Sequence, residues 1–325
     1  MDAPQTYTNS SQQIAFGGLR VAFGVVWLIN AWFQGESVYL GHFLDWFATS
    51  PAHESPWLHS YAAWLVQAIQ HVGAGPVGTA IVVVDVLLAL SLLTGLWLRV
   101  VGWIGVLYGL FVWSAMGALG EPYTIGATDP GPGIVYAIAF LTIILAVPLE
   151  EQAAYPDRPH PTSNRDPGRQ LALPRVLFGL LWAFDASWKW HPYFLMHFTG
   201  YLTAAESGQP HWIVDYIQFF INVIHLIGPS ICALLVALLE TFIAVSLLSG
   251  KWLRFALPAG VLFTLGIWTT AEGWGGPYGP GNTAMPGNLV GNAILYAYIF
   301  AFLAAAYLPL GELDWWRRRA TLSHV

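Results

Sequence analysis

The sequence has one cysteine and few charged residues, and these two shortages exclude several classes of protein. The single cysteine, Cys232, lies within an apolar run. One cysteine cannot form an intrachain disulfide or a CxxC redox pair. Charged residues make up 9% of the chain, whereas soluble domains carry about 25%. A chain with so few charges cannot cover a water-facing surface, so the composition predicts an integral membrane protein.

Sequence motifs of several enzyme and binding classes are also absent. There is no P-loop, GxGxxG turn, CxxCH haem site or Ser/His/Asp hydrolase elbow. The ten histidines include no H-x-x-x-H pair of the kind that binds zinc, so we predict no metal, haem or flavin. No basic patch accompanies the net charge of −6, which argues against a nucleic-acid partner. The polar N-terminus lacks a basic start and predicts no removable signal peptide.

Long apolar runs dominate what is present. Hydrophobic residues make up 56% of the chain, and a helix needs roughly 20 apolar residues to cross a bilayer. The candidate spans cover residues 14–34, 76–97, 100–119, 132–149, 174–190, 229–250, 254–271 and 289–309. Two shorter segments, 57–72 and 211–227, carry more polar residues and predict interfacial or re-entrant helices. We therefore expect an all-α integral membrane protein with about eight spans in contact with the lipid bilayer.

The chain contains an internal duplication. The stretch 85–123 recurs at 240–278, at an offset of 155 residues. Each copy has an acid within an apolar run, a Gly-x-Trp-Leu-Arg sequence, a second apolar run and a Gly/Pro-rich loop. Four spans per copy is an even number, so both copies enter the membrane from the same side and form two parallel four-helix transmembrane repeats. The predicted domains are a first repeat at 1–150, a linker at 151–173 and a second repeat with a basic tail at 174–325.

Positive charges set the predicted orientation. Of the twelve Lys and Arg residues, only Lys189 falls on the outer side of the eight-span arrangement. Under the positive-inside rule both termini and the linker are then cytoplasmic, as in a multi-pass protein of the cell (inner) membrane.

Several of these features together resemble one known family. They are the aromatic first helix with Arg20 and Trp27, the acid-bearing second helix, the G-x-W-x-R sequence at 95–99, and the loop GEPYTIGATDPG at 120–131. This pattern resembles the DoxX/DoxD-like membrane family, and the loop is most similar to that of the DoxD subunit of thiosulfate:quinone oxidoreductases. The resemblance implies electron transfer from a small anion, such as thiosulfate, at the outer face to a membrane quinone. The second copy departs from it in the loop that begins at Gly275.

The acids Asp85 and Glu240 are the leading catalytic candidates. Each falls near the middle of its predicted span, where an ionisable group costs roughly 2.5–3.5 kcal/mol. We interpret them as proton donors or acceptors for quinone chemistry, or as partners of a buried cation. The alternative is a protonated carboxyl group that holds two helices together.

A paired substitution distinguishes the two copies. Asn30 and Gln34 of the first copy become Asp185 and Lys189 in the second. The spacing i, i+4 places each pair on one helix face, so the second copy gains an ion pair. We interpret Lys189 as the binding residue for an anionic substrate, positioned by Asp185. The alternative is an ordinary surface salt bridge.

Other candidates lie in the predicted outer segments. His42 and His197 occupy matching positions in the two copies and are candidates for proton handling. The Gly-rich loops after the third spans could present backbone N–H groups to an anion, with hydroxyl donors from Tyr123, Thr128, Tyr278 and Thr283. Glu121 and Asp129 in the same loop would repel an anion and fit proton transfer better. Tight turns that need glycine are the alternative interpretation.

Two tryptophans are candidates for a cofactor pocket. Trp113 and Trp268 match between the copies and lie within the third predicted spans, where they could line a quinone slot. Core packing is the alternative. Two functions remain open at this point: a quinone-linked oxidoreductase or its membrane subunit, with or without a soluble or membrane partner subunit, and a non-catalytic accessory subunit or proton-coupled carrier of small solutes.

Overall fold

The structure, a computed structural model, describes residues 10–48, 55–121, 123, 126–127, 129–154, 167–276 and 290–308. Within these residues it consists of helices and connections, with no strand. We call residues 10–154 the first half and residues 167–308 the second half. The first half contains α1 (Ser10–Gln34), α2 (Ser37–Gly41), α3 (Asp45–Ala48), α4 (Pro56–Val72), α5 (Ala74–Thr94), α6 (Leu98–Ala115), η1 (Ala118–Gly120) and α7 (Pro132–Ala154). The second half contains α8 (Pro167–Gln170), α9 (Ala172–Lys189), α10 (Pro192–Met196), α11 (Phe198–Ala204), α12 (His211–Ile227), α13 (Pro229–Ser249), α14 (Leu253–Thr269), η2 (Gly273–Gly275) and α15 (Ala293–Tyr307).

Several helices have the length and composition of membrane spans. Within the described chain, four reach that standard, namely residues Ile14–Gln34 of α1 together with α5, α6 and α13. Exposed apolar side chains such as Leu87, Leu107 and Leu238 cover their outer faces. A surface this apolar marks a membrane-embedded protein. α12, α14, α15 and the apolar part of α7 are shorter, and α9 contains three charged residues.

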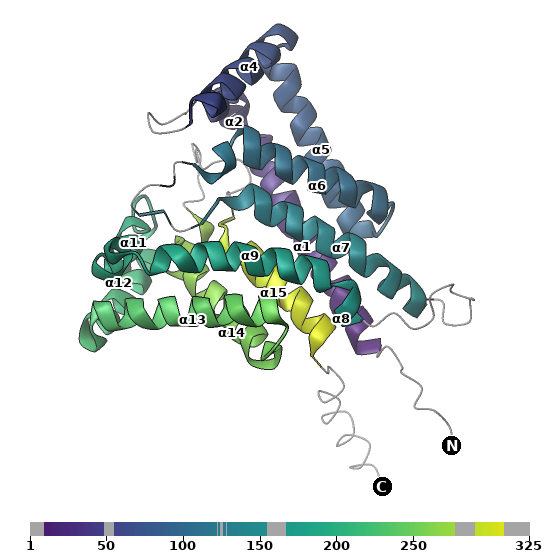
Figure 1. The fold of residues 1–325 in the computed structure, drawn as a ribbon. Helices are drawn as coiled ribbons and strands as arrows, with labels where there is room; N and C mark the ends of the chain where they lie inside the picture. The colour runs from purple at the N-terminus through teal and green to yellow at the C-terminus, as the bar shows by residue number, and fades with distance from the viewer. Residues whose placement is uncertain are drawn as a thin grey trace, which may run out of the picture.

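The helices of the two halves keep a constant spacing along the chain. α12, α13 and α14 begin 155 residues after α4, α5 and α6, since 211 − 56, 229 − 74 and 253 − 98 all equal 155. Within the halves, α1 packs on α5 and α6 on α7, just as α9 packs on α13 and α14 on α15. Between the halves, α1 contacts α15, α9 contacts α7, and α7 contacts α15. Figure 1 shows α15, in yellow, beside α9 in the middle of the molecule.

The Gly-x-Trp-Leu-Arg sequence ends one helix and starts the next. α5 is followed by Gly95 at φ 79° and α13 by Gly250 at φ 72°, the left-handed conformation that closes many helices. The last carbonyl groups of a helix lack partners within it. Here the guanidinium of Arg20 donates to the Leu92 carbonyl, and that of Arg175 donates to the Leu247 carbonyl. Each arginine of a first helix therefore fixes the end of the helix that carries the buried acid.

Small residues bring α6 and α14 close to their partners. A Cβ atom on Gly105 would lie 2.4 Å from the Phe140 ring, and one on Gly260 would lie 2.5 Å from the Phe300 ring. Small residues at such positions let membrane helices approach closely. α7 and α15, the partners in these contacts, supply much of the largest cluster of buried apolar residues. They form the rigid centre against which the second-half cavity is built.

Candidate functional site

The second half encloses a cavity of about 630 Å³. This volume falls within the ~300–1,000 Å³ that small-molecule sites occupy. Most of the lining is apolar or aromatic, from α11, α12, α13 and α14. The polar residues in the lining include Asp129, Asp185, Lys189, Glu240, Glu272, Asn292 and Tyr296. A few polar groups on an apolar wall are typical of a site that orients one part of a largely apolar ligand.

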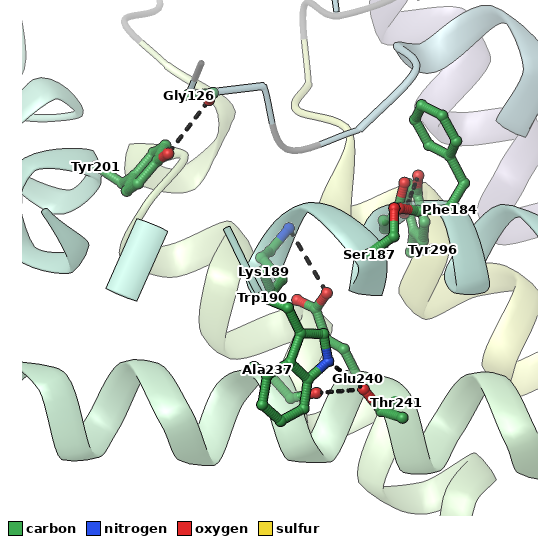
Figure 2. Close-up of polar contacts among 11 residues, drawn as sticks. Gly126, Phe184, Ser187, Lys189, Trp190, Tyr201, Ala237, Glu240, Thr241 and Tyr296 are labelled. Atoms are coloured by element: carbon green, nitrogen blue, oxygen red, sulfur yellow. Dashed lines mark hydrogen bonds and ion pairs between the residues drawn. The ribbon is translucent and has the colours of Figure 1, made fainter. Parts of the chain in front are cut away.

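A buried ion pair lies in the cavity wall. Lys189 at the end of α9 is 7% exposed, and Glu240 in the middle of α13 is 2% exposed. The Lys189 Nζ lies 3.6 Å from Glu240 Oε2 and 5.4 Å from the centre of the Phe194 ring. Figure 2 shows Lys189 reaching from its helix to the carboxyl group on the facing helix. One acid of the matched pair, Glu240, is therefore the partner of a buried cation.

The charge of Lys189 acts on Asp185, its predicted i, i+4 partner, and also on Glu240 of the facing helix. The ion pair that the structure shows joins Lys189 to Glu240, across two helices. The Asp185 Oδ2 accepts a hydrogen bond of 3.0 Å from the Tyr296 hydroxyl on α15. Because α9 packs between α13 and α15, its two polar side chains bind different neighbours. Both are buried, so this is not a surface salt bridge.

Two polar atoms on this face of α9 have no hydrogen-bond partner among the described residues. They are Asp185 Oδ1 and Trp182 Nε1. Both residues line the cavity and are at least 95% buried. Leaving a buried polar atom unsatisfied costs about 1–3 kcal/mol. Such costs are typical of a site that is completed by a bound molecule or water.

One end of the cavity is lined by residues that come from both halves. Glu272, just after α14, accepts hydrogen bonds from the backbone N–H groups of Asn292 at 3.1 Å and Ala293 at 3.0 Å, at the start of α15. The side-chain amide of Asn292 donates to Asp129 of the first half at 3.0 Å. Burial, and to a lesser extent the charge of Asp129, raise the pKa of Glu272 to about 7, although the two backbone hydrogen bonds lower it. Asn292 thus joins two carboxyl groups at one end of the cavity.

The raised pKa of Glu272 predicts a pH-dependent stability. A glutamate in an unfolded chain titrates near ~4.3, so the folded protein holds this proton more tightly. The free energy of unfolding should therefore fall as pH rises from about 4.5 to about 7, and level off above that. Glu272→Gln keeps an oxygen that accepts from Asn292, and it should abolish this pH-dependent decrease, which amounts to roughly 3–4 kcal/mol in the wild type. Thermal unfolding in detergent from pH 4.5 to 8 checks this, with exposed Asp215→Asn as control; an unchanged pH dependence in Glu272→Gln contradicts it.

The matching region of the first half is closed. Asp85 is fully buried and accepts a bond of 3.3 Å from the Tyr108 hydroxyl, with Gln34 beside it. The adjoining space is about 10 Å³, which is about the minimum for one water molecule. Phe47 and Phe111, whose ring centres lie 6.5 Å apart, belong to the apolar cluster of the first half that includes Tyr108 and Val112, two residues that line this small space. Asp85 was expected to be catalytic, and the structure places it without room for a ligand.

Side-chain size explains the difference between the halves. The residues 155 positions after Phe47 and Phe111 are Leu202 and Gly266, and both line the second-half cavity. A Cβ atom built on Gly266 meets no atom within 4 Å. The second half therefore opens where the first half places two aromatic rings.

The two predicted cofactor-binding tryptophans serve another purpose. The Trp113 indole donates to the Pro130 carbonyl at 2.9 Å, and the Trp268 indole donates to the Val290 carbonyl at 2.8 Å. Neither indole is part of the described cavity lining. Each indole ties the segment before the last helix of its half to the third long helix, and a quinone slot beside these tryptophans stays a prediction. The aromatic lining of the cavity comes instead from α9 to α12, α14 and α15.

The predicted outer residues are distributed over the surface. His42 pairs with Asp45 at 2.9 Å, and both side chains are exposed. The His197 ring stacks on Tyr193, with ring centres 4.3 Å apart. Neither histidine lines the cavity. Tyr123 donates to the Leu119 carbonyl and packs against aromatic rings of α9, while Thr128, Tyr278 and Thr283 lie outside the described residues.

Sequence reasoning did not select four residues of the polar lining as binding residues. They are Asp129, Glu272, Asn292 and Tyr296. For Glu272 and Asn292 a signal was present, namely the contrast between the copies. The matching residues of the first copy are Gly117, at an offset of 155, and Pro132, at an offset of 160. The crossing of Asp129 into the other half has no sequence signal that we can identify.

No protein family, curated protein or solved structure matches this chain. Among the described residues, no group of three or more His, Cys, Asp or Glu side chains is arranged to hold a metal ion. The geometry of the cavity therefore carries the functional argument.

Proposed function

We propose that the chain is a multi-pass membrane protein made of two parallel four-helix transmembrane repeats, with eight spans and both termini in the cytoplasm. The constant helix spacing of 155 residues supports the duplication. The reciprocal contacts of α1 with α15 and of α9 with α7 support a twofold relation between the halves. The distribution of Lys and Arg supports the orientation in the cell (inner) membrane.

We further propose that the second-half cavity binds a quinone, and that the protein is a quinone-linked oxidoreductase or its membrane subunit. A quinone is an apolar molecule of the bilayer that accepts two electrons and two protons. The apolar wall would hold its ring and tail. Lys189 would donate a hydrogen bond to a carbonyl oxygen of the head group, as would the Trp182 indole after a small movement. The observation that carries the proposal is this apolar cavity with a buried Lys189–Glu240 pair in its wall.

The electron donor in this proposal is a small anion such as thiosulfate, acting at the outer face. The cavity is not suited to hold such an anion, because its lining has one lysine and four carboxyl groups. Negatively charged carboxylates in a low-dielectric site repel an anion strongly. We therefore assign the cavity to the neutral quinone, and the donor to the outer face or to a partner subunit.

A proton-coupled carrier of small solutes is the second candidate. The observation in its favour is the same excess of carboxyl groups around a cavity inside a helical bundle, since intramembrane acids often form proton relays. A carrier would move its solute into liposomes together with protons and without an electron acceptor. The oxidoreductase would require the acceptor.

The test begins with protein purified in mild detergent. Extraction followed by mass spectrometry should find bound quinone in roughly equal molar amount to the protein. Thiosulfate and a soluble quinone analogue are then added, and reduction of the analogue is followed by absorbance. Bound quinone without reduction keeps the binding proposal and assigns the electron donor elsewhere. Protein that neither retains nor binds quinone contradicts the proposal and favours the carrier or an accessory role.

A further inference from the structure

Polar side chains form a continuous line through the second half, from its outer end to the middle of α13. Asn292, at the start of α15, lies one helical turn from Tyr296 on the same face. Tyr296 donates to Asp185 on α9 at 3.0 Å. Asp185 in turn lies one turn from Lys189, which pairs with Glu240. Every member of this line contributes to the wall of the same cavity.

The outer end of the line has a carboxyl group on each side. Asn292 donates its backbone N–H to Glu272 and its side-chain amide to Asp129. The Asp129 Oδ1 also accepts from the Gly131 backbone at 2.8 Å, which holds the carboxyl group in place. This carboxyl comes from the first half of the chain, so the cavity of the second half is completed by the other repeat.

At the matching positions the first half lacks the polar residues of this line, and the described space beside its acid is small. Gly117 replaces Glu272 and Pro132 replaces Asn292, while Asn30 and Gln34 replace the two charged residues of α9. Its acid, Asp85, remains, but the adjoining space is closed. The second half therefore has Glu272 and Asn292 beside its cavity, at positions where the first half has residues without a polar side chain. A purely structural role for them would leave this joint loss unexplained.

We propose that the outer end of the cavity is its proton entrance, and that Asp129 passes protons there between the outer side and Asp185. Besides Asp129, the ionisable groups that line the same cavity are Glu272 beside the entrance, Asp185 and Lys189 on α9, Tyr201 on α11, Glu240 on α13 and Tyr296 on α15. Asp185 Oδ1 and Asn292 Oδ1, on residues more than 90% buried, have no hydrogen-bond partner among the described residues. They are places where a water or ligand hydroxyl could link the two carboxyl groups.

The inference deepens the proposed function, because reduction of a quinone consumes two protons that must reach the buried head group. The effect on turnover rests on the proposed function. The side of the membrane from which protons enter rests on the proposed orientation. The route itself concerns this chain's own carboxyl groups and can be measured without any quinone. Failure of one proposal is therefore separable from failure of the other.

Asp129→Asn is the test variant, because the remaining amide oxygen can still accept from Gly131 and Asn292. Infrared spectroscopy follows hydrogen–deuterium exchange of the carboxyl band that Asp185→Asn removes. We expect Asp129→Asn to slow this exchange at least tenfold, Asp129→Glu to restore most of it, and the exposed control Asp215→Asn to leave it unchanged. Asn292→Ala should also slow it, and this variant decides the matter if Asp129→Asn does not fold.

Quinone assays give the second readout. Binding of a short-tailed quinone, measured by quenching of tryptophan fluorescence, should change less than threefold in Asp129→Asn. Reduction of the same quinone by thiosulfate should fall at least tenfold at pH 7 and lose its pH dependence. If Asp129→Asn equals Asp215→Asn in both exchange and turnover, the proposal of a proton entrance is overturned. A wild-type protein that binds no quinone but shows the exchange effect would overturn only the proposed function.

Discussion

Lys189→Gln is expected to weaken quinone binding roughly 10- to 100-fold, because a charge-assisted hydrogen bond contributes about 1.5–3 kcal/mol. It should also lower the free energy of unfolding by about 3–5 kcal/mol, since Glu240 would lose its buried partner. The chain already holds Gln34 beside Asp85 in the first half, so glutamine facing a buried acid is compatible with the fold. Tryptophan quenching by the quinone and thermal unfolding in detergent measure the two effects.

A double variant separates binding from stability. Lys189→Gln with Glu240→Gln leaves no buried charge in the pair, so most of the lost stability should return while binding stays weak. Lys251→Gln removes an exposed lysine at the other end of α13 and is the matched control. If Lys189→Gln binds quinone as well as Lys251→Gln does, Lys189 is not part of the binding site.

Gly266→Phe is expected to abolish ligand binding, with at least a 100-fold weaker affinity, without loss of stability. The new ring would enter the open part of the cavity, as Phe111 does in the first half. Burying a phenyl group in apolar surroundings contributes roughly 1.5–3 kcal/mol, so the melting temperature should stay the same or rise. A titration with the quinone and a thermal melt of the same sample give both results.

The chain offers two controls for this substitution. Gly18→Phe adds the same ring on an exposed face of α1, where a Cβ also meets no atom within 4 Å; binding should not change. Phe111→Ala removes the ring that closes the first half and should cost about 3–5 kcal/mol. If Gly266→Phe binds quinone as well as Gly18→Phe does, the cavity is not the binding site.

The helices could be predicted from the sequence because the signal lies in contiguous runs. The predicted spans 76–97 and 229–250 match α5 and α13 within three residues at each end, and the predicted segments 57–72 and 211–227 match α4 and α12. The main difference is α7, which continues to Ala154, past the predicted end at 149. The sequence Pro-Leu-Glu-Glu-Gln there is polar, yet the helix continues through it to Ala154.

The site was only partly predictable, because its contacts join distant helices. Composition and repetition select Glu240 and Lys189 as unusual, but periodicity along α9 cannot tell which neighbouring helix receives each side chain. The i, i+4 spacing predicts the interaction within α9, and packing of α9 against α13 and α15 adds Glu240 and Tyr296 as further partners. The closure of the first half likewise follows from Phe47 and Phe111, two apolar residues that attract no attention in a sequence.

The central claim is that the second-half cavity, and not the lipid-facing surface or the first half, binds a quinone. The most direct measurement is photoaffinity labelling of the purified protein with an azido-quinone, followed by peptide mass spectrometry. The account predicts that the label falls on cavity residues of α9, α12, α13 and α14, that unlabelled quinone competes for it, and that Gly266→Phe loses it. Label spread over the exposed faces of α5 and α6, or concentrated near Asp85, would contradict the account.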